Sequence, residues 1–219
     1  MNDLEKQTSI PHVTRKKTKW MALFAFAMCA GIMPGSYPRA RAEGGGFSEA
    51  ERTLLTQGEL VSRPSVQTLD GAEWLGGTSF QVINRPMAEV WIALGDVQTY
   101  PYMLPATREA RLEDEEPGAR IVRVLQSSMG VEARYSLRLT TDHGAHEIHF
   151  ELDPRRPHDI EGARGFIEVR AFPGHPEQTM VTWAVRVRLP GAIVTMFRES
   201  VQLWLMRVPS TLKEYLEGL

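Results

Sequence analysis

The sequence predicts an α+β domain in which a curved antiparallel sheet wraps around a long C-terminal helix, with a signal peptide at the N-terminus. Three observations predict it. Between Phe80 and Pro105 a strand is followed by two short helical segments. From Thr107 to Leu189, short runs alternate apolar and polar residues, as in an antiparallel sheet with one wet face. From about Ala192, apolar residues recur every three or four positions, so a helix can cover the dry face.

Residues 1–42 have the three parts of a secretory signal peptide. A basic stretch precedes an apolar run over residues 20–33, and the small-residue site Ala40-Arg41-Ala42 follows. The apolar run is shorter than the roughly 20 residues of a membrane-spanning helix. We therefore expect cleavage after Ala42 and an exported protein, periplasmic or secreted. An uncleaved signal would instead leave the protein anchored in the membrane.

Charge and cysteine content exclude several classes of partner and site. The chain has 25 basic and 27 acidic residues, of which 7 and 2 fall in residues 1–42, so residues 43–219 carry 18 − 25 = −7. An acidic domain lacks the basic face that phosphate binding needs, so no nucleic-acid partner is expected. The single cysteine, Cys29, lies in the signal, so residues 43–219 offer no disulfide, thiol nucleophile or zinc–thiolate site.

Residues 43–77 are predicted to form an N-terminal extension with a short helix. Ser48 and Glu51 have the spacing of a capping box, and Gly58 ends the helix. Residues 59–63 are a candidate edge strand before a proline, and residues 65–77 are predicted to be a loop.

Residues 80–105 are predicted to open the main domain. Pro86 stops the first strand because proline has no N–H for the ladder. Val90, Trp91 and Leu94 then share one helical face. Asp96 is placed to cap the next short helix.

The strands and the last helix follow from periodicity. An acidic turn is expected at residues 113–118, between the first two strands of the series. Pro209 is expected to kink or restart the C-terminal helix, because its ring clashes with the preceding turn. The predicted strands are residues 107–112, 119–126, 131–140, 145–152, 160–172 and 178–189.

The stretch before Pro105 resembles a known superfamily. It reads Pro-x-x-x-Val-Trp, then Asp, then Tyr-Pro and a closing Pro, at Pro86, Val90, Trp91, Asp96, Tyr100, Pro101 and Pro105. This pattern resembles the START-like or SRPBCC superfamily, which has the helix-grip fold and includes polyketide cyclases/dehydrases and lipid transport proteins. The resemblance covers roughly residues 78–217, so residues 78–219 are predicted to form one such domain. It implies a deep apolar cavity between the sheet and the C-terminal helix.

Side-chain parity gives the candidate ligand-binding residues of that cavity. Two are expected at its mouth, and the others on the dry face of the sheet or on the helix; for any single one of them, ordinary core packing is the simpler interpretation. The set is Met103, Leu104, Tyr135, His146, Ile148, Phe150, Phe166, Val181, Trp183, Phe197, Val201 and Trp204. No catalytic residue is assigned with it.

Two polar groups are candidates for sites of other kinds. His143, His146 and His149 cannot converge on one ion from a turn and a strand, so no metal is expected, and no cofactor either. Arg155 and Arg156 could contact an anion or a partner, but a solvated turn with Asp–Arg pairs is the simpler interpretation.

Three functions follow. The first is an exported protein that binds or transfers a hydrophobic small molecule, in particular a lipid, with brief membrane contact during transfer. The second is an enzyme of the polyketide cyclase/dehydratase type, with Tyr135 and His146 as acid and base, together with Glu168. The third is a structural module without a ligand. The absence of a hydrolase or kinase motif favours a binding protein over an enzyme.

Overall fold

The structure, a computed structural model, describes residues 46–69, 71–128 and 131–218, and the predicted signal peptide lies outside this part. The helical elements are α1 (Glu49–Thr56), α2 (Met87–Gly95), the 3₁₀ helix η1 (Val97–Thr99), α3 (Tyr100–Met103), α4 (Gly191–Met206) and α5 (Val208–Glu217). The strands are β1 (Val61–Leu69), β2 (Ala72–Ile83), β3 (Thr107–Glu116), β4 (Ala119–Ser128), β5 (Val131–Asp142), β6 (Glu147–Leu152), β7 (Gly162–Phe172) and β8 (His175–Arg188).

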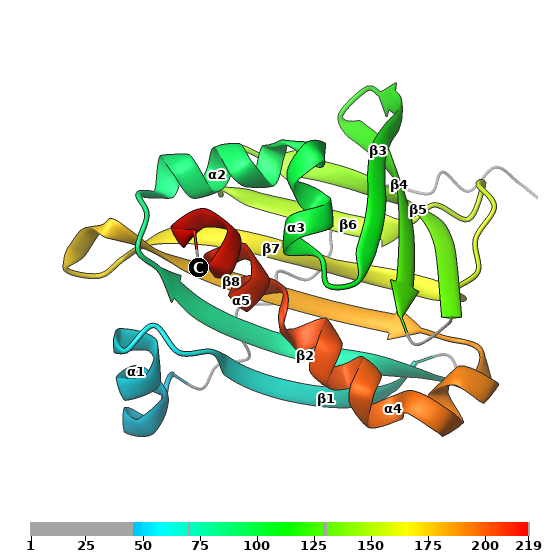
Figure 1. The fold of residues 1–219 in the computed structure, drawn as a ribbon, viewed down its shortest axis with the longest axis horizontal. Coiled ribbons are helices and arrows are strands. Elements are labelled where there is room, and N and C mark those ends of the chain that lie inside the picture. The colour runs from blue at the N-terminus through cyan, green and yellow to red at the C-terminus, as the bar shows by residue number, and fades with distance from the viewer. Residues whose placement is uncertain (1–45, 70, 129–130, 219) are drawn as a thin grey trace, which may run out of the picture. The chain divides into compact units, whose positions relative to one another are not determined.

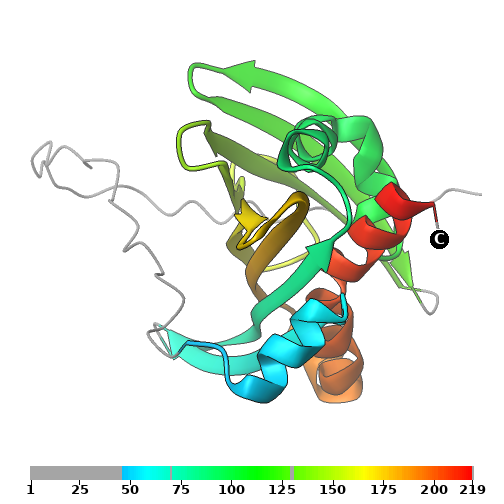
Figure 2. The ribbon, with the colours of Figure 1, turned by 90° about the vertical axis from the view of Figure 1, so that its left-hand side faces the viewer.

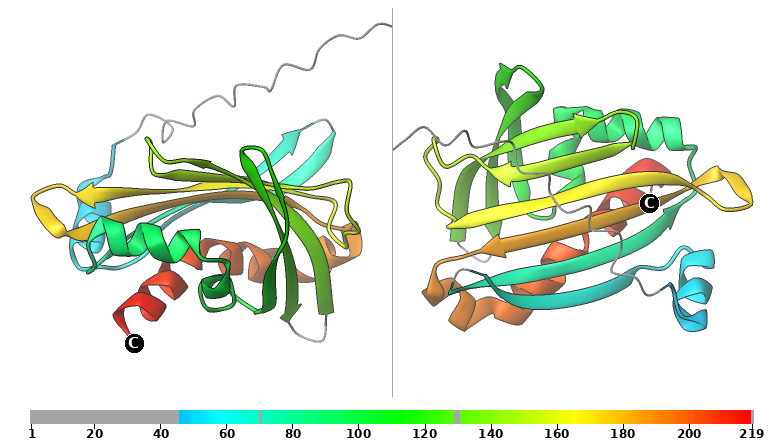
Figure 3. Two further views of the ribbon diagram at one scale, coloured as in Figure 1. Left: turned by 90° about the horizontal axis from the view of Figure 1, so that it is seen from above. Right: turned by 180° about the vertical axis from the view of Figure 1, so that it is seen from behind.

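The eight strands form one antiparallel sheet in the order β1-β2-β8-β7-β6-β5-β4-β3 (Figure 1). The sheet curves from β3 at one edge to β1 at the other, and α4 and α5 lie on its concave side (Figure 2). Seen from above, α2 and α3 lie on the same side (Figure 3). The expected helix-grip arrangement is therefore confirmed.

The core lies between the concave face and these helices. Val90 and Leu94 of α2, and Leu212 of α5, are fully buried in one cluster with Ile167 and Trp183 of the sheet. Successive side chains along β7 and β8 point alternately into this cluster and to the outer face of the sheet.

α1 packs on the outer face of β1 and β2. Its first turn has the predicted capping box, with Ser48 Oγ accepting from the Glu51 backbone and Glu51 accepting from that of Ser48. Leu55 joins Phe80 and Val82 in a small second cluster, so the convex side of β2 is covered as well.

The loop predicted at residues 65–77 is instead a β-hairpin, which makes this prediction wrong. β1 pairs along its whole length with residues 72–80 of β2, and Gly71 in the turn has a φ of 75°. Gly76 and Gly77 lie inside β2, where an added Cβ would fall 1.9 Å from the Val185 carbonyl oxygen and 2.3 Å from that of Arg63. Glycines that indicate a loop in sequence here allow neighbouring backbones to approach closely.

The acidic turn predicted at residues 113–118 is also wrong in part, since β3 continues to Glu116 and only Pro117-Gly118 turns. Arginines of β4 and β5 pair with two carboxylates of the acidic run: Arg123 pairs with Glu113, and Arg138 with Glu116. Cross-strand pairs of opposite charge stabilise such a strand.

The C-terminal helix is divided near Pro209, as predicted. α4 ends at Met206 and α5 begins at Val208, so Pro209 occupies the first turn of α5, where its missing N–H costs nothing. Within the residues that the structure describes, no helix has the length and apolarity to cross a membrane.

Candidate functional site

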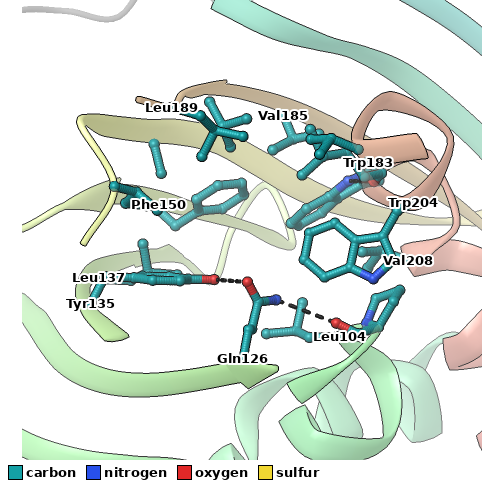
Figure 4. A pocket seen from close by; sticks show the side chains of 16 residues that line it. Leu104, Gln126, Tyr135, Leu137, Phe150, Trp183, Val185, Leu189, Trp204 and Val208 are labelled. Atoms are coloured by element: carbon teal, nitrogen blue, oxygen red, sulfur yellow. Dashed lines mark hydrogen bonds between the residues drawn. The ribbon is translucent and has the colours of Figure 1, made fainter. Parts of the chain in front are cut away.

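A cavity of about 80 Å³ lies between the concave face of the sheet and the C-terminal helices (Figure 4). Its lining is apolar except for one amide, one phenol and two indoles, and contains no charged residue. The lining residues are Leu104, Pro105, Gln126, Tyr135, Leu137, Phe150, Ile160, Ala163, Trp183, Val185, Val187, Leu189, Val201, Trp204, Leu205 and Val208.

Two stacked aromatic rings form the sheet side of the cavity. Phe150 of β6 and Trp183 of β8 stack with centroids 4.8 Å apart and an angle of 16°. Gly165 of β7, which pairs with Phe150, makes this packing feasible, because a Cβ there would lie 2.5 Å from Phe150 Cζ. The glycine in the middle of β7 therefore shapes the cavity.

A short chain of hydrogen bonds runs along another wall. The Tyr135 hydroxyl donates to Gln126 Oε1 at 2.8 Å, and Gln126 Nε2 donates to the Pro105 carbonyl oxygen at 3.4 Å (Figure 4). Gln126 Nε2 also lies 3.3 Å from Thr107 Oγ1. Burial raises the pKa of Tyr135 well above its usual range, so the phenol stays protonated and neutral.

The two indoles differ in their hydrogen bonding. Trp183 Nε1 donates to the Leu205 carbonyl oxygen at 2.9 Å and so ties β8 to the end of α4. Trp204 Nε1 is buried and has no hydrogen-bond partner among the described residues. Buried N–H groups are nearly always paired, so this donor is an exception.

Half of the predicted ligand-binding residues line the cavity. They are Leu104, Tyr135, Phe150, Trp183, Val201 and Trp204. The dry-face alternation along β5 and β8, and the helical period of α4, therefore identified real neighbours.

The others lie elsewhere. Met103, Ile148 and Val181 are buried in the core beside the cavity but do not line it. Phe197 lies on α4, and its side chain is outside what the structure describes. Phe166 pairs with His149 and Ala184 on the outer face, while its neighbour Ile167 points inward, so its predicted orientation is wrong.

His146 is also displaced from its predicted position. β6 begins at Glu147, and His146 belongs to the preceding turn with a φ of 52°. Its ring packs edge-on against Trp91 of α2 with centroids 5.3 Å apart, and His143 approaches the same indole at 5.9 Å. The residue therefore supports the packing of α2 and does not face the cavity.

The catalytic set of the cyclase hypothesis is not assembled. Tyr135 lines the cavity, but His146 lies against Trp91, and Glu168 points to the outer face, where Arg170 Nε donates to it at 2.8 Å. Acid–base catalysis needs its groups within hydrogen-bond reach of one substrate.

Several lining residues carry a sequence signal that the prediction did not use. Val185, Val187 and Leu189 continue the parity of Trp183, and Gln126 continues that of Val124. Gln126 was missed because an amide does not look like a wall residue.

The two polar groups that were candidates for other sites have structural roles. Among the described residues no three His, Cys, Asp or Glu side chains group in a way that could hold a metal ion. Arg155 pairs with Asp153 and with Glu116 of β3 at 2.8 Å each, and Arg156 pairs with Asp114 at 2.7 Å. The loop after β6 is thus fastened to β3 by Asp–Arg and Glu–Arg pairs.

Fold and cavity together define a helix-grip protein with an apolar interior. Residues 77–217 match the model of the family described as "Polyketide cyclase / dehydrase and lipid transport", and because the match spans more than half of the chain, the protein belongs to this family. The resemblance seen in the opening stretch is thereby confirmed. A search of curated proteins finds no match.

Solved structures share the fold at low identity. A STAR-related lipid transfer protein from Xanthomonas axonopodis (fragment 25–204) has a TM-score of 0.56 and 12% identity, over 71% of this chain and 98% of that one. A protein from Thermus thermophilus has a TM-score of 0.54 and 18% identity, over 64% and 93%. A START superfamily protein from Mycobacterium smegmatis has a TM-score of 0.51 and 14% identity, over 64% and 96%. At these identities the likeness establishes the fold alone.

Proposed function

We propose that this protein binds a hydrophobic molecule, in particular a lipid, between its sheet and its C-terminal helices, and that it works after export. The observation that carries the proposal is the cavity, whose walls are apolar apart from Gln126, Tyr135 and two indole nitrogens. Apolar surface that a ligand buries there contributes about 25 cal/mol per Å². Family membership supports the same interpretation, since the family's description includes lipid transport.

The cavity has to widen before a lipid can enter. Its volume of about 80 Å³ is below the roughly 300–1,000 Å³ of ordinary ligand pockets. We assign the widening to α4, which acts as the lid. Two polar contacts hold α4 against β2. Gln202 Nε2 donates to the Gly76 carbonyl oxygen at 3.1 Å, and Arg198 pairs with Glu73.

α5 is the fixed part of the C-terminal pair. Glu217 accepts from the Asn84 backbone at 2.7 Å, and Arg85 donates to the Leu216 carbonyl oxygen at 2.9 Å. Leu212 of the same helix is fully buried. A lid that moves while α5 stays needs a joint, and the break near Pro209 supplies it.

Transfer would include brief contact with a membrane. The most exposed large apolar or aromatic side chains of the described helices are Ile92 at 72%, Leu203 at 71% and Tyr102 at 64%. Met103 and Leu104 were expected at the mouth of the cavity, but Met103 is buried and does not line it, so the role of a gate falls to Leu104 beside the lid.

The ligand test is extraction and mass spectrometry of protein purified from its native host. The function predicts a co-purifying lipid in the wild type. Ala163→Leu, which fills the cavity, should lose it, while Ala88→Leu on the exposed side of α2 should keep it. Protein that carries nothing would leave the structural-module hypothesis, whereas equal loading of both variants would mean that the lipid binds outside this cavity.

The export test is separate. We expect the mature protein from the native host to have the mass of residues 43–219 and to be found outside the cytoplasm. A mass that includes residues 1–42 would contradict cleavage, and a membrane-bound fraction of that mass would indicate an anchored protein.

A further inference from the structure

The lining of the cavity restricts the charge and the hydrogen-bonding groups of a ligand as well as its shape. None of its sixteen lining residues is Asp, Glu, Lys, Arg or His. A carboxylate or phosphate inside it would lose its hydration without a counter-charge, which is far more costly than burying a neutral group. The part of a ligand that enters is therefore uncharged.

One wall group is without a partner. Trp204 Nε1 is buried and donates to no acceptor among the described residues, whereas Trp183 Nε1 and the Tyr135 hydroxyl are both paired. Figure 4 draws the Trp204 indole among the lining side chains, and no hydrogen bond reaches its nitrogen. An indole N–H can only donate, so its complement is a ligand atom that accepts.

An alkane cannot satisfy this group. A purely apolar ligand that packed against Trp204 would leave Nε1, which is already buried, without an acceptor. A ligand with a carbonyl or hydroxyl oxygen at that point would pair it. The apolar remainder would lie over the stacked rings of Phe150 and Trp183.

We propose that the ligand is an uncharged amphiphile, such as a ketone, ester or alcohol with an apolar body, whose oxygen accepts a hydrogen bond from Trp204 Nε1. This inference rests on the proposed function, because it names the chemical class that the same cavity takes. Trp204 then selects the class, and the apolar walls supply most of the affinity.

The test compares three ten-carbon probes, 2-decanone, decane and decanoate, on the full-length wild type and on Trp204→Phe, which keeps an aromatic ring but removes the N–H. We expect the substitution to weaken the binding of 2-decanone about 3- to 10-fold, which is the usual contribution of one neutral hydrogen bond to affinity. Decane should bind the variant as tightly as it binds the wild type, or more tightly. Decanoate at pH 8 should bind the wild type at least about tenfold more weakly than 2-decanone.

A matched control and a second readout keep the test independent of folding. Trp74→Phe makes the same change on the outer face, beside Arg164 at 4.7 Å, and should leave all three affinities unchanged. In the wild type, the indole ¹H–¹⁵N signal that Trp204→Phe abolishes should move downfield with 2-decanone and not with decane.

The outcomes separate this inference from the function on which it rests. Equal weakening of 2-decanone and decane, no downfield movement of the Trp204 signal, or tightest binding of decanoate would overturn the neutral-acceptor inference and leave a lipid-binding protein. Failure of every probe to bind would overturn both.

Discussion

Gly77 shows how one residue without a side chain can determine the course of a sheet. Its position in β2 brings the backbone of β1 so close that a Cβ would lie 2.3 Å from the Arg63 carbonyl oxygen and 2.8 Å from Pro64 Cα. Backbone atoms cannot move aside as the end of a flexible side chain can.

We predict that Gly77→Ala lowers the free energy of unfolding by at least about 2 kcal/mol, because β1 must shift or strain. Urea denaturation measures it. Gly191→Ala, at a position with open space around it, is the control and should change stability by less than about 0.5 kcal/mol. A tolerated Gly77→Ala would show that the two strands do not approach this closely.

The Tyr135 hydroxyl is the second residue whose contribution can be isolated. Tyr135→Phe removes the donor to Gln126 Oε1 and leaves that acceptor in a nearly dry cavity. We predict a loss of about 1–2 kcal/mol in ligand-stripped protein, measured by urea denaturation. Tyr102→Phe, at an exposed tyrosine, should cost almost nothing; similar losses in both variants would argue against the buried hydrogen bond.

At the scale of elements, the two C-terminal helices are attached to the sheet in different ways. α5 buries Val208 and Leu212 and binds the end of β2 through Glu217 and Arg85. α4 buries Leu205 and Met206 at its C-terminal end, while Arg198, Glu199, Ser200 and Leu203 are exposed and polar contacts from Gln202 and Arg198 join the helix to β2. A helix with fewer buried contacts opens at lower free energy.

We predict that amides of α4 before Val201 exchange hydrogen faster than those of α5, measured by hydrogen–deuterium exchange with mass spectrometry. Trp183→Phe, which removes the bond to the Leu205 carbonyl oxygen, should speed exchange in α4 and leave α5 unchanged. Equal protection of both helices would contradict the lid assignment.

How well each element could be predicted depended on whether its signal was local. The capping box of α1, the alternation of β5 and β8 and the break near Pro209 are all set within a few residues, and all are confirmed. The hairpin β1–β2 was missed because glycines indicate a loop in sequence, whereas Gly76 and Gly77 are required by the close approach of β8 and β1, which the local sequence does not show.

The residues of the candidate site, too, could be predicted where a local pattern determines their orientation. Trp183 and Trp204 follow from parity and helical period, and both line the cavity. Phe166 and Ile167 are adjacent and both apolar, so either could face inward, and only the pairing with β6 and β8 decides. His146 was misplaced because its φ of 52° ends the alternation one residue before the strand begins.

At the scale of the whole domain, buried phenols make stability depend on alkaline pH. Burial raises the pKa of Tyr100 to about 12, and that of Tyr135 higher still. Tyrosines of the unfolded chain ionise near pH 10. Above that pH the unfolded state binds fewer protons than the folded state, so the free energy of unfolding must fall.

We predict a steady loss of stability from about pH 10 upward, measured by urea denaturation at a series of pH values. Tyr100→Phe removes one of the two groups, so its stability should fall less steeply between about pH 10 and pH 12. The variant is nevertheless less stable at pH 8, because the hydroxyl no longer donates to the Leu94 carbonyl oxygen. An identical slope in the variant would show that Tyr100 is not protonated and buried in the folded state.

The acidic run of β3 has a further consequence, because β3 is one margin of an open sheet whose other margin is β1. A second copy aligning its own β3 there would bring Glu113, Asp114, Glu115 and Glu116 against an identical row of carboxylates, and β1 offers Pro64, which has no amide hydrogen to donate. Both borders thus oppose strand-by-strand stacking into fibrils, although the sheet is left unclosed.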